Sequence, residues 1–438
     1  EAKWIVTSSS LTILTLILES SFYFVNILSV SRLGAKELAA MSLAVTCQAI
    51  FTMAPAFGLL SAMDTFCSNA YTASRDKTLV GFHFQRGIIA VCAHFILTIP
   101  FLWNAEWLLL LIGQDPEVAQ LTGAFLRIHI LGVLPFALFE ATKRYLQAQG
   151  IMRAGTIVAL VVAPIHWMSN FFLVRSSTYG LGFIGAPIVN VLSNCLLFVG
   201  IAIYAYNSRA RETWGGWDMS AFHSMSAFYR LAIPAIAMIC ANWVYFEMLN
   251  ILAAYFGANQ LAGHAILFNS IFLLVQISYG LGYSISPRVG NLIGAAKPRQ
   301  AYIAANIAAL AAILIGATGT LCLALLSGQW IAIYTDDPAV AREAAKLVPV
   351  ACMFVVCDGL NAVLGSILRG LGRQKASAGS FLTGFYAFAI PIGIYLAFYR
   401  NFETLGLWWG ICIGILVSCI LQIGYVYKFI DWKDEVRL

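Results

Sequence analysis

Apolar runs of about 20 residues or more recur along the whole chain, and they restrict the folds open to it. A helix of that length crosses the hydrocarbon core of a bilayer, whereas a transmembrane barrel needs alternating segments of about ten residues, which the sequence lacks. Of the 438 residues, 61% are hydrophobic and only 11% are charged. We therefore expect an all-α, polytopic membrane protein embedded in a lipid bilayer.

Twelve membrane spans are expected from the apolar runs. Their predicted bounds are residues 5–31, 37–65, 79–103, 117–147, 154–174, 182–206, 227–256, 260–290, 300–327, 339–370, 375–398 and 405–430. The clearest polar connector is 207–226, which contains Arg209, Arg211 and the flexible pair Gly215-Gly216. It predicts a first lobe at 1–206, a cytoplasmic linker at 207–226 and a second lobe at 227–438.

The two groups of six spans repeat each other. Four landmarks return in order after 222 or 223 residues: Asp115-Pro-Glu-Val-Ala119 as Asp337-Pro-Ala-Val-Ala341, Leu146 and Gly150 as Leu368 and Gly372, Asn69 as Asn291, and Gly34-Ala-Lys-Glu-Leu-Ala39 as Gly257-Ala-Asn-Gln-Leu-Ala262. Because six is even, both groups enter the membrane in the same orientation. The repeat therefore predicts two pseudo-symmetric six-helix lobes related by an axis along the membrane normal.

Lys and Arg are unevenly shared between the loops. The loops after even-numbered spans, with the adjoining span ends, hold fifteen of them, and those after odd-numbered spans hold six. Positive residues remain on the cytoplasmic side, so both termini are expected in the cytoplasm. The net charge of +6 is spread a few residues at a time, which does not indicate a nucleic-acid partner.

Glu247 is the formally charged residue beyond Arg230 in the apolar run from Tyr229 to Phe256. At about 1.5 Å per residue, it lies roughly 13 Å inside the end at Phe256. A carboxylate at the bilayer centre costs about 2.5 to 3.5 kcal/mol on insertion scales. We expect Glu247 to be paired, to face a watery cavity or to carry a proton, and the last two place it in a transport pathway.

Asp358 and Glu19 are further candidates for proton or cation coupling. Asp358 is mid-span, with Asn361 one turn on; neighbouring hydrogen bonds could neutralise it, but a charge at this depth favours a coupling role. At the 223-residue interval Glu19 corresponds to Asn242, five residues before Glu247. Glu19 lies either in the pathway or in a solvated pair near a cavity mouth.

Aromatic residues occur beside these acids in the second lobe. Aromatics at helical spacing usually pack, but next to a carboxylate they can hold an organic cation through cation–π contact. Pro234 permits a bend below Glu247, because it removes a backbone donor from its helix. The candidates for a substrate cavity are Trp243, Tyr245, Tyr279, Tyr283, Asn361 and Tyr386.

Other polar groups within spans are expected to be mainly structural. Glu140 stands four residues before Arg144, which favours an ion pair on one helix. Asp64 either braces the loop after its span or joins a polar path, and Arg127 needs a partner or a cavity. Ten cysteines without metal-type spacing are expected to pack inside the protein. Hydrogen-bonded interior positions are expected for His94, His129, His166 and His264.

Several stretches carry a family resemblance. They are Leu60-Ser-Ala-Met-Asp-Thr-Phe-Cys-Ser-Asn-Ala-Tyr71, Gln85-Arg86, Tyr145-Leu-Gln-Ala-Gln-Gly150, Ser286-Pro-Arg-Val-Gly-Asn-Leu-Ile-Gly-Ala295, and Asp358 with Leu368-Arg-Gly-Leu-Gly-Arg-Gln374. Together they resemble the signatures of the multidrug and toxic compound extrusion (MATE) transporters, eukaryotic branch. The resemblance extends over essentially the whole chain.

This resemblance implies a twelve-helix exporter of the MATE/MOP-type fold that exchanges protons for organic, often cationic, solutes. It also implies that acids on the seventh and tenth spans take part in coupling, and these positions match Glu247 and Asp358. The family commonly has another Glu where this chain has Asn242, and Gln and Gly where it has Asn69 and Thr72. We expect Glu19 to replace part of the missing charge.

The expected function is therefore proton-coupled export of organic solutes or xenobiotics by alternating access of the two lobes. The coupling ion is expected to be H+ rather than Na+, with no other cofactor, no metal and no enzymatic activity. A functional monomer in the vacuolar or plasma membrane is expected.

Three rival functions are weighed against this one. A lipid-linked saccharide flippase should meet phosphates with several Arg residues, and the chain offers chiefly Arg127. A passive channel would lack coupling, which a gradient-driven uphill flux measurement would reveal. A membrane-embedded hydrolase would need paired acids or a His motif such as His-Glu-x-x-His, and no such His motif occurs.

Overall fold

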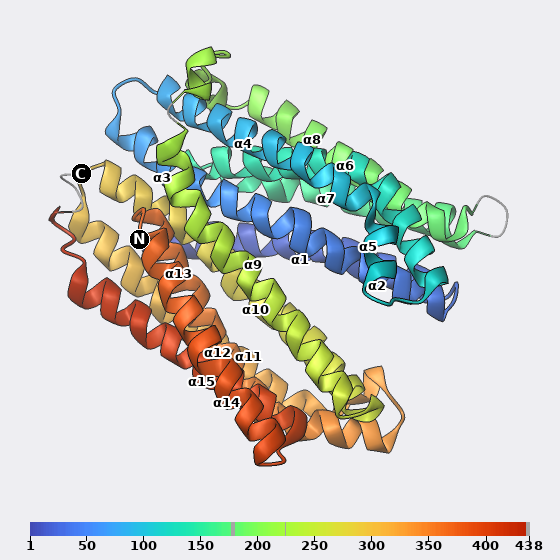
Figure 1. Ribbon diagram of the computed structural model, residues 1–438. Helices are drawn as coiled ribbons and strands as arrows, with labels where there is room; N and C mark the ends of the chain where they lie inside the picture. The colour runs from blue at the N-terminus through green and yellow to red at the C-terminus, as the bar shows by residue number, and fades with distance from the viewer. Residues whose placement is uncertain (177–179, 224, 435–438) are drawn as a thin grey trace. The chain divides into compact units, whose positions relative to one another are not determined.

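The computed structural model describes residues 1–176, 180–223 and 225–434 (Figure 1). Among these residues, twelve helices are long and apolar enough to cross a membrane, and no strand occurs. The predicted all-α architecture is therefore confirmed. The predicted span bounds hold to within four residues, except that the second span continues to Ala73 and the ninth to Tyr334.

The first six spans are formed by α-helices, some of which continue into π-helical turns. They comprise α1 (Ala2–Val30), α2 (Ala35–Gln48) with η1 (Ala49–Met53) and α3 (Ala54–Ala73), α4 (Thr78–Trp103), α6 (Pro116–Ala148), α7 (Arg153–Asn170) with η2 (Phe171–Arg175), and η3 (Gly182–Ile184) with α8 (Gly185–Tyr206). A short helix, α5 (Ala105–Leu111), precedes α6.

The last six spans are longer on average. They comprise α9 (Ser226–Tyr255), α10 (Ala258–Gly294), α11 (Pro298–Tyr334), α12 (Pro338–Gly370), α13 (Gln374–Leu382) with η6 (Thr383–Ala389), α14 (Ile390–Ile394) and η7 (Tyr395–Tyr399), and α15 (Glu403–Gly424) with η8 (Tyr425–Phe429). Two short turns, η4 (Arg209–Thr213) and η5 (Met219–Phe222), precede α9.

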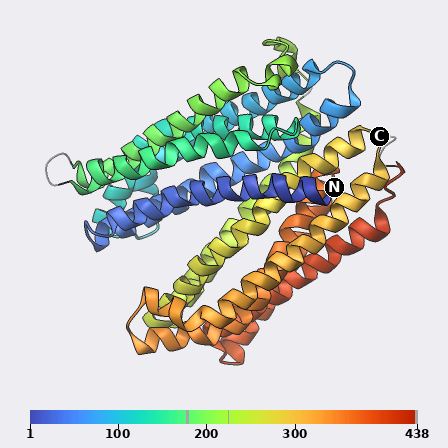
Figure 2. The same cartoon turned by 180° about the vertical axis from the view of Figure 1, so that it is seen from behind.

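The chain forms two compact units, Leu14–Cys240 and a second one made of Glu1–Ile13 with Ala241–Leu438. This division differs from the expected lobes, because its boundaries fall inside α1 and α9 rather than at the polar connector. In the second unit α10, α11 and α12 pack against one another and α15 packs on α12, as both views show (Figure 1, Figure 2).

Close helix contacts explain why the start of α1 belongs to the second unit and the start of α9 to the first. Gly280 of α10 admits α1, since a methyl group there would lie 2.8 Å from the Cα of Ile13. The hydroxyl of Thr12 also donates to the carbonyl of Gly280 at 2.7 Å. In the other unit Gly58 of α3 admits α9, because a methyl group would lie 2.5 Å from the Cα of Ile236. Side-chain packing between helices sets the unit boundaries inside α1 and α9, and composition carries no information about that packing.

The polar connector belongs to the first unit and is held there by hydrogen bonds to its helices. Gln85 of α4 donates to the carbonyl of Gly216 and accepts from the backbone N–H of Asp218. The hydroxyl of Tyr145 donates to the carbonyl of Ala210 at 2.7 Å. The flexibility expected of this connector is therefore limited by side chains that the neighbouring helices supply.

Equivalent sequence signals begin and end α6 and α12. Asp115 and Asp337 each precede a proline and accept backbone N–H groups of the first turn, which is the role of an N-cap. Gly150 (φ 77°) and Gly372 (φ 73°) follow the two helices in the left-handed region, where a side chain would be strained. The internal repeat thus specifies helix ends as well as spans.

Candidate functional site

Glu247 lies on α9 in the second unit and is half-buried. Its Oε2 accepts a hydrogen bond of 3.4 Å from Asn250, one turn further along the helix. Asn242, the other predicted coupling residue on α9, is also half-buried. Glu247 does not take part in any of the ion pairs formed by the described residues. Its carboxylate is therefore supported by an amide rather than by a cation.

The hydrogen bond from Asn250 to Glu247 is the last in a series of hydrogen bonds between side chains. The Oδ1 of Asn250 lies 2.9 Å from Nε2 of His264 on α10, and Nδ1 of His264 lies 3.1 Å from Nε1 of Trp408 on α15. His264 and Trp408 are each 2% exposed. Sequence analysis missed this chain, because its members come from three helices; the Glu-x-x-Asn spacing was its one visible signal.

Asp358 lies on α12 at a close approach of two helices and is buried. A methyl group at the adjacent Gly359 would lie 2.6 Å from the Oγ of Ser278 on α10. Tyr279 of α10 interacts electrostatically with Asp358 and also with Tyr283, so these three predicted residues lie together. Like Glu247, Asp358 is absent from the ion pairs of the described residues. A buried carboxyl without a cation can bind a proton or an organic cation.

Asn361 is oriented toward α15. Its Oδ1 accepts hydrogen bonds from Ser418 at 2.8 Å and from Gln422 at 2.7 Å. The structure therefore assigns Asn361 a contact between α12 and α15 that the one-turn spacing from Asp358 did not predict.

The predicted aromatic residues divide into buried and accessible groups. Tyr245 is 1% exposed and packs edge-on against Phe385 at a centroid distance of 5.0 Å, which is the position of a core residue. The hydroxyl of Tyr386 donates to the carbonyl of Ala241 at 2.9 Å. Trp243 and Tyr386 are each 38% exposed. These two rings remain available for contact with a solute.

Glu19 lies in the first unit, in a cluster that contains two acids and one cation. The ammonium of Lys143 on α6 lies 2.7 Å from Oε1 of Glu19 on α1 and also bonds Glu140. The side chains of Lys143 and Glu140 are 8% and 6% exposed, and that of Glu19 is 14% exposed. Glu19 is therefore a paired residue, and the cation that pairs it was not predicted.

The expected partner of Glu140 was Arg144, and the structure gives a different arrangement. Glu140 bonds Lys143, while Arg144 donates to Asp64 of α3 at 2.7 Å. This ion pair joins α3 to α6, which agrees with a bracing role for Asp64. Spacing along one helix could not decide this, because neighbouring helices supply competing partners.

The remaining predicted groups are mostly paired. Arg127 donates to Glu106 of α5 at 2.7 Å, so it has the expected partner. Three histidines form hydrogen bonds, namely His94, His166 and His264. His129 was predicted wrongly, since neither of its buried ring nitrogens has a partner among the described residues. All ten cysteines are free thiols. Cys322 is exposed, so the expectation that the cysteines pack inside is wrong for it, and the other nine are buried or half-buried.

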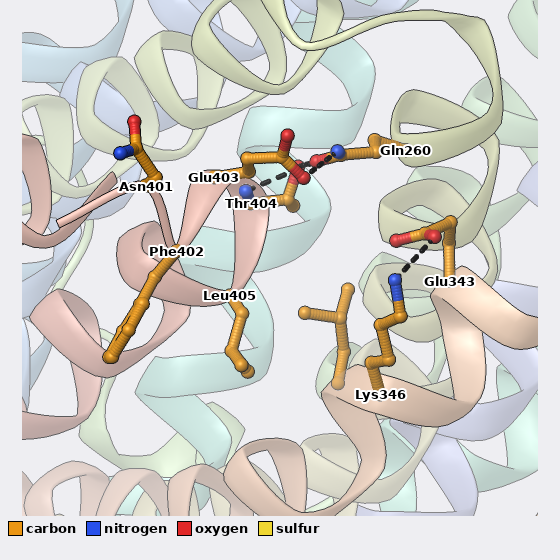
Figure 3. A pocket seen from close by; sticks show the side chains of 9 residues that line it. Gln260, Glu343, Lys346, Asn401, Phe402, Glu403, Thr404 and Leu405 are labelled. Carbon is orange, nitrogen blue, oxygen red and sulfur yellow. Dashed lines mark hydrogen bonds and ion pairs between the residues drawn. The ribbon is translucent and has the colours of Figure 1, made fainter. Parts of the chain in front are cut away.

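A pocket of about 220 Å³ lies in the second unit, away from the predicted residues. It is lined by Gln260, Glu343, Lys346, Leu347 and residues 401–405 (Figure 3). Gln260 donates to Glu403 and accepts from Thr404, and Lys346 pairs with Glu343 at 2.6 Å, as the dashed lines show (Figure 3). The side chains of Gln260, Glu343, Lys346, Glu403 and Thr404 are thus already bonded within the pocket.

One protein-family model matches most of the chain. The MatE model matches residues 12–172 and 234–395. The two matches start 222 residues apart and end 223 residues apart, so they confirm the internal repeat.

Known relatives cover nearly all of this chain. An uncharacterized transporter of Saccharomyces cerevisiae is 35% identical over 99% of the chain, which spans 62% of that relative's length. An uncharacterized transporter of Schizosaccharomyces pombe is 31% identical over the whole chain, which spans 82% of its length. Multidrug and toxin extrusion protein 1 of Xenopus tropicalis is 34% identical over 92% of the chain and 70% of its own length.

A solved structure has the same fold. The crystal structure of the eukaryotic MATE transporter AtDTX14 superposes with a TM-score of 0.91 at 28% identity, covering 99% of this chain and 97% of the other.

Proposed function

This chain belongs to the MatE family and is an integral, multi-pass membrane protein, and from this premise we propose that it exports organic, often cationic, solutes in exchange for protons. The names of its relatives support extrusion of drugs and toxins as the general activity. The coupling ion proposed is H+ rather than Na+. We place the protein, as a monomer, in the vacuolar or plasma membrane with both termini in the cytoplasm.

The observation that supports coupling is a contrast between acids within the spans. In the first unit Glu19, Glu140 and Asp64 each bond a cation. In the second unit Asp358 and Glu247 have no such partner among the described ion pairs. A carboxylate left without a cation in a low-dielectric setting is costly, so each of these two gains from binding a proton or a cationic solute.

Proton and solute then compete for the same carboxyl groups. Facing the lumen or the outside, the region of Glu247 and Asp358 takes up a proton, which removes the charge that held the cation, and the solute leaves. The protein reorients by alternating access, the proton leaves to the cytoplasm, and a new solute binds. Among the predicted cavity residues, Trp243 and Tyr386 are the exposed aromatic groups, and both are proposed to contact the solute.

Glu19 is proposed to contribute to coupling from the first unit. It shares Lys143 with Glu140, so this group has one carboxylate more than cations and can hold a proton. This role compensates for Asn242, which cannot bind a proton where a carboxylate would.

The flippase alternative is weakened by Arg127. Its guanidinium is bonded to Glu106 and to the carbonyl of Trp103, so a lipid phosphate would have to displace both. No feature of the described residues favours a passive channel over an exchanger.

Exchange in proteoliposomes tests the proposal. An imposed pH gradient should drive accumulation of tetraethylammonium or ethidium in the native protein, and Glu247→Gln and Asp358→Asn should each abolish it while the protein still folds. Glu343→Gln is the matched control, because Glu343 is a second-unit acid that pairs with Lys346. Normal gradient-driven exchange by both neutralised variants would refute the assignment.

A further inference from the structure

The chain of hydrogen bonds from Trp408 to Glu247 has its directions fixed at both ends. The indole N–H of Trp408 can only donate, so Nδ1 of His264 must accept. Nε2 of His264 therefore carries the proton of the neutral ring and donates to Oδ1 of Asn250. This leaves the amide N–H of Asn250 to face Glu247, which accepts it.

We propose that His264 is a positioning residue that keeps Asn250 donating to Glu247 and thereby favours the ionised carboxylate. The inference rests on the proposed role of Glu247 and extends it to two residues, His264 and Trp408, that reach the Glu247 carboxylate only through Asn250. Without His264, the Asn250 amide can turn, and Glu247 loses its oriented donor. Hydrogen bonds to a carboxylate favour its charged form, so their loss should let Glu247 bind a proton at higher pH.

Among the described residues, the side chain of Asn250 bonds Glu247 and His264 and no other group. Both His264 and Trp408 are almost fully buried, and the ring of Phe268 lies 6.0 Å from that of His264. A second proton on His264 would break the bond from Trp408. His264 of α10, Tyr386 of η6 and Cys412 of α15 are titratable groups that interact with this part of α9. Asp358 lies one turn after Phe354 of α12, whose ring packs against that of Phe246.

An infrared titration of the purified full chain in lipid nanodiscs tests the proposal without requiring transport. The Glu247 carboxyl absorption is identified by its loss in Glu247→Gln and followed from about pH 4 to 9. His264→Leu should raise its midpoint by about 1 to 2 pH units, the scale of one hydrogen bond to a charged group. His264→Gln keeps a donor toward Asn250 and should restore the native midpoint. Repeating the series with Asp358→Asn removes the contribution of the buried carboxyl group of α12.

Histidine NMR provides a second measurement that does not depend on the stability of His264→Leu. The protein has six histidines, and the ¹⁵N signals of His264 are those lost in His264→Gln. At neutral pH they should show the Nε2–H tautomer, and Trp408→Phe should allow the other tautomer and raise the Glu247 midpoint. An Nδ1–H tautomer in the native protein, or equal midpoints in native, His264→Leu and Trp408→Phe, would overturn the inference. Loss of transport in Glu247→Gln is a separate result and concerns the proposed function alone.

Discussion

Lys143 places its ammonium 2.7 Å from Glu19 on another helix while it also bonds Glu140 one turn away on its own. Asp64 and Arg144 form a balanced ion pair beside it, so the five groups carry three carboxylates and two cations. An uncompensated charge in such a site is costly. We expect the cluster to hold one proton, because it has one carboxylate more than cations.

The first prediction concerns the stability of this cluster. Lys143→Met leaves two carboxyl groups without their cation and should destabilise the protein by about 3 to 5 kcal/mol. Glu19→Gln should cost far less, because Lys143 keeps Glu140. Unfolding followed by tryptophan fluorescence measures both, and Lys346→Met, at an exposed ion pair, is the control. If Lys143→Met is as stable as the control, the cation is not needed to neutralise these acids.

The second prediction concerns coupling through Glu19. Glu19→Gln removes the excess carboxyl group, so the number of protons exchanged per solute in proteoliposomes should fall. Asn242→Glu in the same variant should restore it, because that change returns an acid to the equivalent position in the other repeat. Undiminished coupling in Glu19→Gln would end the idea that Glu19 compensates for Asn242.

The third prediction concerns the close contact of α15 with the preceding span. A methyl group at Gly410 would lie 2.5 Å from the Cα of Gly393 and 2.6 Å from the carbonyl oxygen of Ala389, both of which are backbone atoms. Gly410→Ala should therefore destabilise the protein by about 1 to 3 kcal/mol, the usual cost of overpacking. Gly424 of α15 has nothing within 4 Å of its added methyl group, so Gly424→Ala should leave the melting temperature unchanged or slightly higher. Equal melting temperatures for the two variants would contradict the contact.

The fourth prediction concerns the pH dependence of an ion pair at the start of α1. Arg288 donates two hydrogen bonds to the carboxylate of Glu1, at 2.7 and 3.0 Å, and this bonding lowers the pKa of Glu1. A lowered pKa in the folded state means stabilisation that is present above the ordinary value and lost as the pH falls through the folded one. Glu1→Gln should lower the free energy of unfolding by about 1 kcal/mol at neutral pH, and this gap should close below about pH 4.

Melting curves of both proteins from neutral to acidic pH measure the gap. Glu212→Gln, at an exposed acid of the connector, should show no such dependence. A gap that stays constant down to acidic pH would show that the carboxylate charge of Glu1 does not contribute.

The repeat and the spans were predictable because short local sequence patterns specify them. Asp115 and Asp337 are visible as caps before prolines, and Gly150 and Gly372 as helix ends. The partner of Glu140 was not predictable, since Lys143 and Arg144 both lie within reach along α6 and the choice depends on Glu19 and Asp64 from other helices.

The unit boundaries and the hydrogen-bond chain through His264 could not be predicted from the sequence, for a related reason. A boundary inside an unbroken helix leaves no mark on composition or hydropathy. Trp408 is 144 residues from His264, and His264 is 14 from Asn250, so no local pattern links them. Sequence showed where charges must be accommodated, and only packing showed what accommodates them.

The π-helical turn η1 accounts for the change of interval between the repeats from 223 to 222 residues. From Gly34 to Asn69 the first repeat has 35 steps, whereas from Gly257 to Asn291 the second has 34. The single wider turn, Ala49–Met53, lies within that first stretch, while the matching α10 is α-helical throughout. The one extra residue is accommodated by a local widening of the helix. The side chains before and after it therefore keep their orientation, and the helix is not interrupted.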